Sequence, residues 1–186
     1  IWSAFFMSFV SMGMNFQQFK TDCHHLMSHT SQIVLLFCAS LLITFNWGLY
    51  IWAISNNLVM DTSFGYYINP LLNVVLGVLL FKEYLTTMQW CSVALATVGI
   101  IFLGIQLGTF PYVALGLAVS FGIYGVVKKK LLIHPFTSIA FEAWLVTPLA
   151  LAYTAYINDS SWVAFQTDTM TAMLFVVSGL TTSAPL

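Results

Sequence analysis

Charged side chains are scarce in this sequence. Only 6% of its 186 residues are Asp, Glu, Lys or Arg, whereas 60% are hydrophobic. Soluble domains carry about 25% charged residues, so this chain could not cover itself with a hydrated surface. The formal net charge of -1 gives no sign of a nucleic-acid partner. The composition therefore predicts an integral membrane protein whose main partner is the lipid bilayer.

Cysteine and catalytic motifs are also sparse. Cys23, Cys38 and Cys91 form no CxxC pair, so a disulfide framework is not expected. No nucleophile–base pair, Walker loop, GxGxxG or HExxH is present, and we expect neither an enzyme nor a bound cofactor. His25 and His29 have the i, i+4 spacing of a zinc site only if this loop is helical, and no second ligand cluster supports them. We expect no metal site.

The sequence also lacks a charged leader and a small-residue cleavage site, so residues 1–19 are expected to be a span and not a signal peptide. We expect the chain to be a fragment of a longer protein, because both of its ends fall in apolar segments.

Long apolar runs are what the sequence has in abundance. Seven of them approach the roughly 20 residues that a helix needs to cross a bilayer: 1–19, 32–54, 63–81, 86–106, 109–127, 136–157 and 170–186. In lipid the backbone must satisfy its hydrogen bonds within its own segment, so these runs should be helices. The expected fold is an all-α membrane bundle with about seven spans, in which short loops make sequential neighbours antiparallel.

The basic residues predict the orientation of this bundle. The chain has no arginine, and its lysines are Lys20, Lys82 and Lys128–Lys130. With seven alternating spans, all five lysines fall in one set of loops and none in the other. Because loops rich in basic residues stay on the inner side of the membrane, the lysine-bearing loops are predicted to be cytoplasmic.

The span 63–81 carries polar residues in its first half. Tyr66, Asn69 and Asn73 share one helical face, and Pro70 frees the carbonyl of Tyr66 because proline has no N–H. Lipid penalises each unsatisfied polar group by several kcal/mol, so this face should point into the bundle. Two interpretations stay open: the groups bond neighbouring helices, or they face a solute. We favour the second.

Two further spans carry similar pairs. Asn46 and Tyr50 lie four residues apart beside Trp47, and Ser120 and Tyr124 have the same spacing. The residues predicted to line a substrate cavity are therefore Asn46, Trp47, Tyr50, Tyr66, Asn69, Asn73, Ser120 and Tyr124. A stripe of small residues, Ala114, Ala118 and Gly122, is expected to serve close helix packing.

Glu142 is the one ionisable residue well inside a span. Intramembrane carboxylates usually face a bundle interior or a wet cavity, so Glu142 is predicted to be a proton or cation partner or to bind a solute. The alternative is a protonated or snorkelling carboxyl bonded to a neighbour such as Ser138, one turn earlier. Pro148 should kink the same helix. Glu83, which follows the span 63–81, is expected to have a structural role as a cap of the next helix.

These residues resemble a known family. The sequence shares motifs with the RarD permeases (chloramphenicol-sensitivity proteins). These permeases belong to the EamA-type branch of the drug/metabolite transporter superfamily. The matching positions are Asn46–Trp47, Tyr50–Ala53, Asn56–Asn57, Gly65–Leu71 and Glu83. The segment "ALGLAVSFGIYGVVKKK" and the helix that carries Glu142 are similar too.

The resemblance implies ten transmembrane helices in two five-helix inverted repeats. Residues 1–106 would be the first EamA repeat without its first helix (helices 2–5), and 109–186 the start of the second (helices 6, 7 and part of 8). It further implies a secondary-active transporter of a small organic solute, working by alternating access in the bacterial inner membrane; a homodimer is left open. The alternative is a non-transporting structural or sensor subunit whose polar faces only pack helices.

Overall fold

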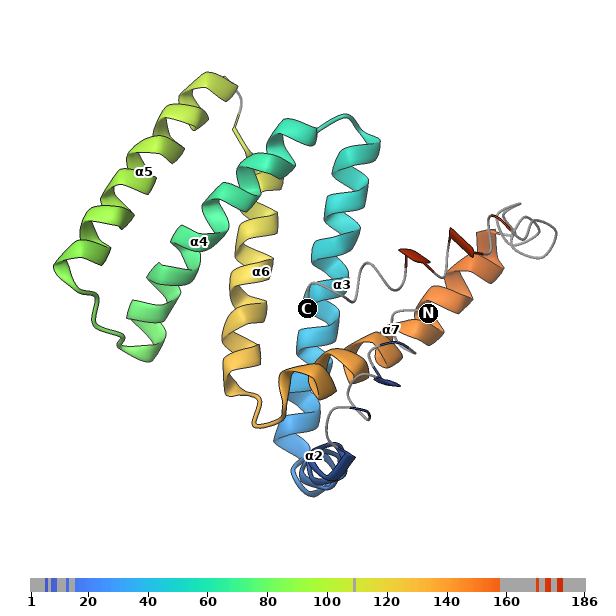
Figure 1. The fold of residues 1–186 in the computed structure, drawn as a ribbon. Helices are drawn as coiled ribbons and strands as arrows, with labels where there is room; N and C mark the ends of the chain where they lie inside the picture. The colour runs from blue at the N-terminus through green and yellow to red at the C-terminus, as the bar shows by residue number, and fades with distance from the viewer. Residues whose placement is uncertain are drawn as a thin grey trace. The chain divides into compact units, whose positions relative to one another are not determined.

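The computed structural model describes residues 16–108 and 110–157, together with residues 6, 8, 9, 13, 170, 173, 174, 177 and 178. Within the two continuous ranges, all regular structure is helical (Figure 1). The helices are α2 (Phe16–Ser28), α3 (Thr30–Ser55), α4 (Val59–Phe81), α5 (Thr87–Leu107), α6 (Tyr112–Lys130) and α7 (Pro135–Ile157). The prediction of an all-α protein is confirmed.

Five of these helices, α3 to α7, are long and apolar enough to cross a membrane. They match the predicted spans 32–54, 63–81, 86–106, 109–127 and 136–157 to within a few residues. The predicted spans 1–19 and 170–186 lie largely outside the described residues, although residues 16–19 belong to the polar helix α2. The chain is therefore a multi-pass membrane protein.

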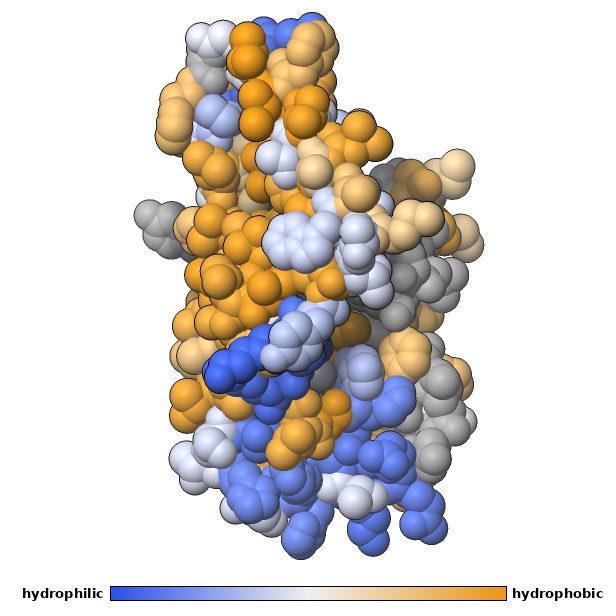
Figure 2. Space-filling model, turned by 90° about the vertical axis from the view of Figure 1, so that its left-hand side faces the viewer, coloured by the Kyte–Doolittle hydropathy of each residue, from blue (hydrophilic) through white to orange (hydrophobic). Residues whose placement is uncertain are grey.

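The chain divides into two compact units, and each is described by itself. Residues 1–40 and 131–186 form one, which we call unit 1; residues 41–130 form the other, unit 2. In unit 2, α4 lies between α5 and α6 (Figure 1). Hydrophobic side chains cover much of the side of the molecule on which α5 lies (Figure 2). Exposed hydrophobic residues of α5 include Leu95, Val98 and Ile105. Such a face suits contact with lipid.

The seam between α4 and α6 is built from small residues. A Cβ added at Gly65 would lie only 3.1 Å from the carbonyl oxygen of Ala114, and one at Gly122 would lie 2.8 Å from the side chain of Leu76. Gly65 thus meets the start of α6 and Leu76 meets its second half, so the two helices run parallel. Ala114 and Ala118 are fully buried. The predicted stripe of small residues does pack a helix, because small side chains let two backbones approach closely.

The link between α4 and α5 corrects one expectation. Thr86 is the N-cap residue that precedes α5, and its side chain accepts a hydrogen bond from the N–H of Gln89 while the Gln89 side chain accepts one from the Thr86 N–H. This capping box satisfies the helix start, so the expectation that Glu83 caps α5 is wrong. Glu83 instead forms an ion pair with Lys129 on α6.

In unit 1, side chains from the first part of the chain hold the segment that precedes α7. The carboxylate of Asp22 accepts a hydrogen bond from the backbone N–H of His134 at 3.1 Å, and Gln32 Oε1 accepts one from the N–H of Leu132 at 3.0 Å. The rings of Phe19 and Phe141 stack with centroids 6.1 Å apart. These contacts tie α2 and the start of α3 to the start of α7.

Two other expectations concern helix interiors and histidines. Pro70 and Pro148 lie inside α4 and α7, where the kink at Pro148 stays a prediction. His29 lies just beyond the end of α2, although its ring is only 4.7 Å from that of His25. Within the described part of the chain, no group of three or more His, Cys, Asp or Glu side chains is placed to hold a metal ion.

Candidate functional site

All eight residues predicted to line a cavity lie in unit 2, where three helices carry them. Helix α3 carries Asn46, Trp47 and Tyr50, α4 carries Tyr66, Asn69 and Asn73, and α6 carries Ser120 and Tyr124. The structure connects several of them by direct contacts, and these contacts divide the set into groups with different environments.

Asn46 and Ser120 bond to each other across α3 and α6. Asn46 Nδ2 donates to the Ser120 hydroxyl at 2.8 Å and to the carbonyl of Leu117 at 3.0 Å. The Ser120 hydroxyl in turn donates to the Leu117 carbonyl at 3.1 Å, and both side chains are buried. Buried polar groups need such partners to offset their lost hydration. This pair, which we call the polar tie, therefore serves helix packing.

Three aromatic side chains form a second group. The Tyr50 and Tyr66 rings meet nearly edge to face, with centroids 5.8 Å apart and an interplanar angle of 73°. Trp47 meets Tyr50 in the same manner, at 6.2 Å and 76°. This geometry is favourable for aromatic pairs because the positive ring edge meets the negative ring face. We call Trp47, Tyr50 and Tyr66 the aromatic wall. Trp47 and Tyr66 each stay about half exposed.

Asn69 stands out because its amide oxygen is unsatisfied. The side chain is only 9% exposed, and its Oδ1 has no hydrogen-bond partner among the described residues. It lies on α4 one turn beyond Tyr66, a member of the aromatic wall. A buried acceptor without a partner costs about 1–3 kcal/mol, so such a group calls for a physical explanation.

The last two predicted residues lie closer to the end of unit 2 that carries the lysines. Asn73 is exposed, and its Oδ1 would be 3.8 Å from a Cβ added at Gly125. The Tyr124 ring lies 5.9 Å from that of Phe121, and the ammonium group of Lys128 lies 5.7 Å from the Tyr124 centroid.

Glu142 lies in unit 1, on α7, where it is 4% exposed. Its Oε1 accepts a hydrogen bond from the hydroxyl of Ser138 at 2.8 Å, and Thr137 and Ser138 beside it are almost completely buried. The bond to Ser138 is the one that the packing interpretation expects. A coupling carboxyl would equally need such a partner, so this contact is compatible with both interpretations.

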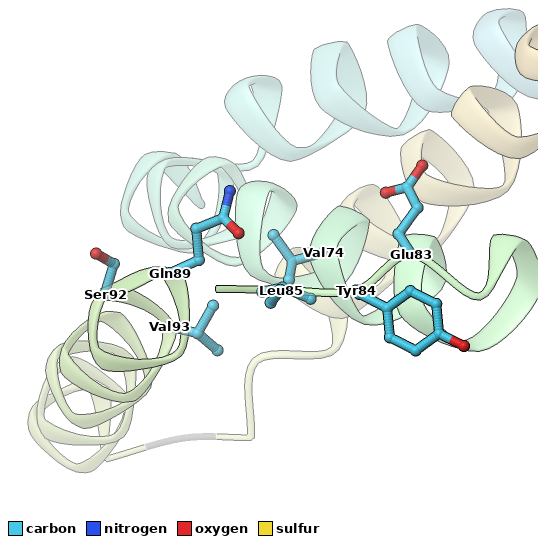
Figure 3. Close-up of a pocket in the computed structure, with 7 residues that line it drawn as sticks. All are labelled: Val74, Glu83, Tyr84, Leu85, Gln89, Ser92 and Val93. Atoms are coloured by element: carbon cyan, nitrogen blue, oxygen red, sulfur yellow. The ribbon is translucent and has the colours of Figure 1, made fainter. Parts of the chain in front are cut away.

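A hollow between α4 and α5 is lined by residues other than the eight predicted cavity residues. It has a volume of about 290 Å³ and is lined by Val74, Glu83, Tyr84, Leu85, Gln89, Ser92 and Val93. Figure 3 shows Ser92 and Tyr84 at its opposite ends, so its polar side chains do not converge on one point. None of the eight predicted cavity residues lines it, and we assign it no binding role.

Sequence inspection missed several residues that the structure brings into play. Asp22 and Gln32 hold the segment that precedes α7, and Lys129 pairs with Glu83. The partners of Asp22 and Gln32 lie 112 and 100 residues away. Spacing along one helix could not have identified them, because the contacts depend on how separate helices pack.

The polar tie leads to a prediction about stability. Asn46→Leu removes both of its bonds to α6, so we expect the protein to lose about 0.6 kcal/mol, with an upper limit of about 1.7 kcal/mol, in unfolding free energy. Unfolding of the full-length protein in detergent would measure the loss. Adding Ser120→Ala to Asn46→Leu should cost less than the sum of the two single changes, because the residues are coupled. Equal stability of Asn46→Leu and the parent would contradict the tie.

Known proteins with similar sequences identify the family. The family model of the EamA-like transporter family matches residues 1–105. The chain is 39% identical to the uncharacterized transporter PA0485 of Pseudomonas aeruginosa, 37% to the uncharacterized transporter YojE of Bacillus subtilis and 37% to protein RarD of Escherichia coli. Each alignment covers 100% of this chain and 62% of the relative.

The chain thus spans about 62% of the length of these relatives. No solved structure matches it significantly. The family match covers more than half of the chain, and protein RarD of Escherichia coli aligns with all of it. The chain therefore belongs to the EamA-like transporter family, as a relative of the RarD proteins.

Proposed function

We propose that the complete protein is a secondary-active transporter that moves a small organic solute across a bacterial inner membrane by alternating access. Membership of a transporter family and five helices able to cross a membrane support this proposal. In such carriers the solute binds near the middle of the membrane and one part of the bundle rocks against another. The lysine-bearing loops would face the cytoplasm. Residues 1–106 and 109–186 would belong to the first and second of two inverted repeats.

The observation that carries the site is the unsatisfied oxygen of Asn69 beside the aromatic wall. A buried acceptor calls for a donor, which a solute with an N–H or O–H group would bring when α4 moves in the transport cycle. The exposed faces of Trp47 and Tyr66 would stack on its apolar part. Asn46 and Ser120, which satisfy each other, would position α3 and α6 rather than bind solute. Asn73 and Tyr124 would line the path toward the lysine end.

The positions of the charged residues further limit the chemical class of the solute. Within unit 2 the ionisable acids and bases of α4 and α6 are Asp61 in the first turn of α4 and, at the other end, Lys82, Glu83 and Lys128–Lys130. The membrane-buried middle of these two helices therefore offers aromatic rings and amides but no fixed charge. This environment suits an uncharged or zwitterionic organic solute. Glu142 on α7 would be the proton or cation partner, because intramembrane carboxyls commonly have that role.

Transport by the full-length protein in proteoliposomes tests the proposal. Radiolabelled chloramphenicol, an uncharged amide with an aromatic ring, is the first probe, because the resembled family is named for sensitivity to it. A set of neutral amides and zwitterionic amino acids follows. We expect Asn69→Leu to lower transport of the accepted probe about tenfold or more, as expected when an essential polar contact of about 1.4 kcal/mol or more is lost. Folded yield should stay normal.

Asn56→Leu is the matched control, since Asn56 is an exposed amide in the turn after α3. Its transport should equal that of the parent. Unchanged transport in both Asn69→Leu and Glu142→Gln would remove these residues from the site.

The polar tie supports one alternative. Asn46 and Ser120 act as packing groups, and a protein in which every polar face had this role would be a structural or sensor subunit. Failure of the well-folded full-length protein to move any member of the solute set would favour that alternative. Saturable transport of one member would exclude it.

A further inference from the structure

The chain reverses direction sharply where α4 ends. Lys82 has a φ of +54°, in the left-handed region, and the N–H of Glu83 bonds back to the carbonyl of Gly77 at 3.4 Å. The Glu83 carboxylate therefore lies over Gly77, where an added Cβ would be only 2.8 Å from Oε2. The absence of a side chain at residue 77 leaves room for this carboxylate. Its position is thus set by the end of the helix itself.

The carboxylate is placed to meet a cation from another helix. Lys129, in the last turn of α6, forms an ion pair with Glu83 Oε1. The same ammonium group lies 4.0 Å from the centroid of the Phe81 ring, within the range of a cation–π contact. Lys129 thus contacts two residues at the end of α4. The neighbouring lysines differ, since Lys128 lies over Tyr124 and Lys130 is exposed without an ion pair among the described residues.

This ion pair closes the α4–α6 seam at its lysine end. Near the start of the seam Gly65 approaches the backbone of Ala114, and in the second half of α6 Gly122 meets the side-chain ends of Leu72 and Leu76. A Cβ added at Gly125, one turn before Lys129, would have an ordinary van der Waals contact with Asn73 Oδ1 at 3.8 Å. The ion pair adds to these contacts a link between the end of α4 and the last turn of α6.

In the proposed two-repeat organisation, the two helices would belong to different repeats. The family match ends at residue 105, so it includes Glu83 on the α4 side but not Lys129 on α6. A contact between these two sides is the kind that must change when one part of a carrier rocks against the other. Half-exposed side chains, 50% for Lys129 and 53% for Glu83, suit such a contact because an exposed ion pair is weak enough to break and form repeatedly.

We propose that Glu83 and Lys129 form a latch that holds the lysine ends of α4 and α6 together in the conformation seen here and releases when that end opens to solute. The opening step rests on the proposed transport function. Gly77 makes room for the latch and Phe81 supports its cation.

Cross-linking of the full-length protein in membranes measures the closure of the seam without needing a solute. The native cysteines are first changed to serine, namely Cys23, Cys38, Cys91 and any cysteine in the remainder of the full-length protein. Asn73→Cys and Gly125→Cys are then added as a pair that faces across the seam. We expect Glu83→Gln to slow oxidative cross-linking of this pair roughly two- to fivefold, the effect of one exposed ion pair on a two-state equilibrium. Lys129→Gln should have the same effect.

The charge swap and a matched lysine change complete the experiment. Glu83→Lys combined with Lys129→Glu should restore the parent rate, whereas Lys130→Gln should leave it unchanged. Spin labels at Leu79 and Ile123, which are exposed positions on the two helices, provide a second measurement. Their distance distribution should shift to longer values in Glu83→Gln. Parent-like rates and distances in Glu83→Gln, or a swap that folds but restores neither, would overturn the latch.

These readouts separate the latch from the transport proposal. A protein that shows the expected cross-linking pattern but transports no probe would refute the proposed function and keep the latch. A protein that transports its probe while Glu83→Gln leaves both readouts unchanged would refute the latch alone.

Discussion

Gly65→Leu is expected to lower the folded yield of the protein severely. A Cβ at this position would lie 3.1 Å from the Ala114 carbonyl oxygen, 3.2 Å from the Ala114 Cα and 3.3 Å from the Leu117 Cβ. Two of these three atoms are backbone, so no side chain can rotate out of the way and α6 itself would have to move. Overpacking a close-packed site costs about 1–3 kcal/mol, occasionally more. We expect the upper part of this range, measured as unfolding in detergent and as monodisperse yield.

Three other glycines supply graded controls. An added Cβ at Gly48 or Gly99 would have no atom within 4 Å, so Gly48→Leu and Gly99→Leu should retain close to parent stability. Gly122 is intermediate, because the atoms that it would meet are the flexible ends of Leu72 and Leu76. Its leucine variant should lose less stability than Gly65→Leu. Equal stability of the Gly65 and Gly99 variants would contradict the close approach of α4 and α6.

Glu142→Gln is expected to uncouple transport from its driving gradient. Glutamine keeps the size of the side chain and can still accept the hydrogen bond from Ser138, but it cannot take up or release a proton or hold a cation by charge. In proteoliposomes, accumulation of the accepted probe against its gradient should therefore be abolished. Exchange of labelled for unlabelled probe, which needs no coupling ion, should continue.

Two variants show whether this effect belongs to the carboxyl of Glu142. Ser138→Ala removes the donor but keeps the acid, so gradient-driven uptake should be weakened and not lost. Asp61→Asn removes another buried carboxylate, in the first turn of α4, and should keep gradient-driven uptake. Loss of exchange together with accumulation in Glu142→Gln, with normal folded yield, would contradict a coupling role and favour a role in solute binding or packing.

The sequence by itself determined the fold class and the approximate helices. Lipid offers no hydrogen-bond partners, so an apolar run of about 20 residues can satisfy its backbone only as a helix. That constraint is local, which is why the predicted span 32–54 and the observed helix Thr30–Ser55 agree so closely. Helical phasing also placed Asn69 and Tyr66 on one side of α4, and the stripe at Ala114 and Ala118 at a packing surface.

Only the tertiary structure decided which polar groups satisfy one another. Asn46 bonds to Ser120, 74 residues away, and Glu83 pairs with a lysine 46 residues away rather than with the start of α5. Phasing gives the direction of a side chain about its own helix axis, but it does not say which neighbour that direction meets. That choice depends on the packing of separate helices, which in unit 2 is set by the close contacts at Gly65 and Gly122. The same packing leaves the oxygen of Asn69 without a partner.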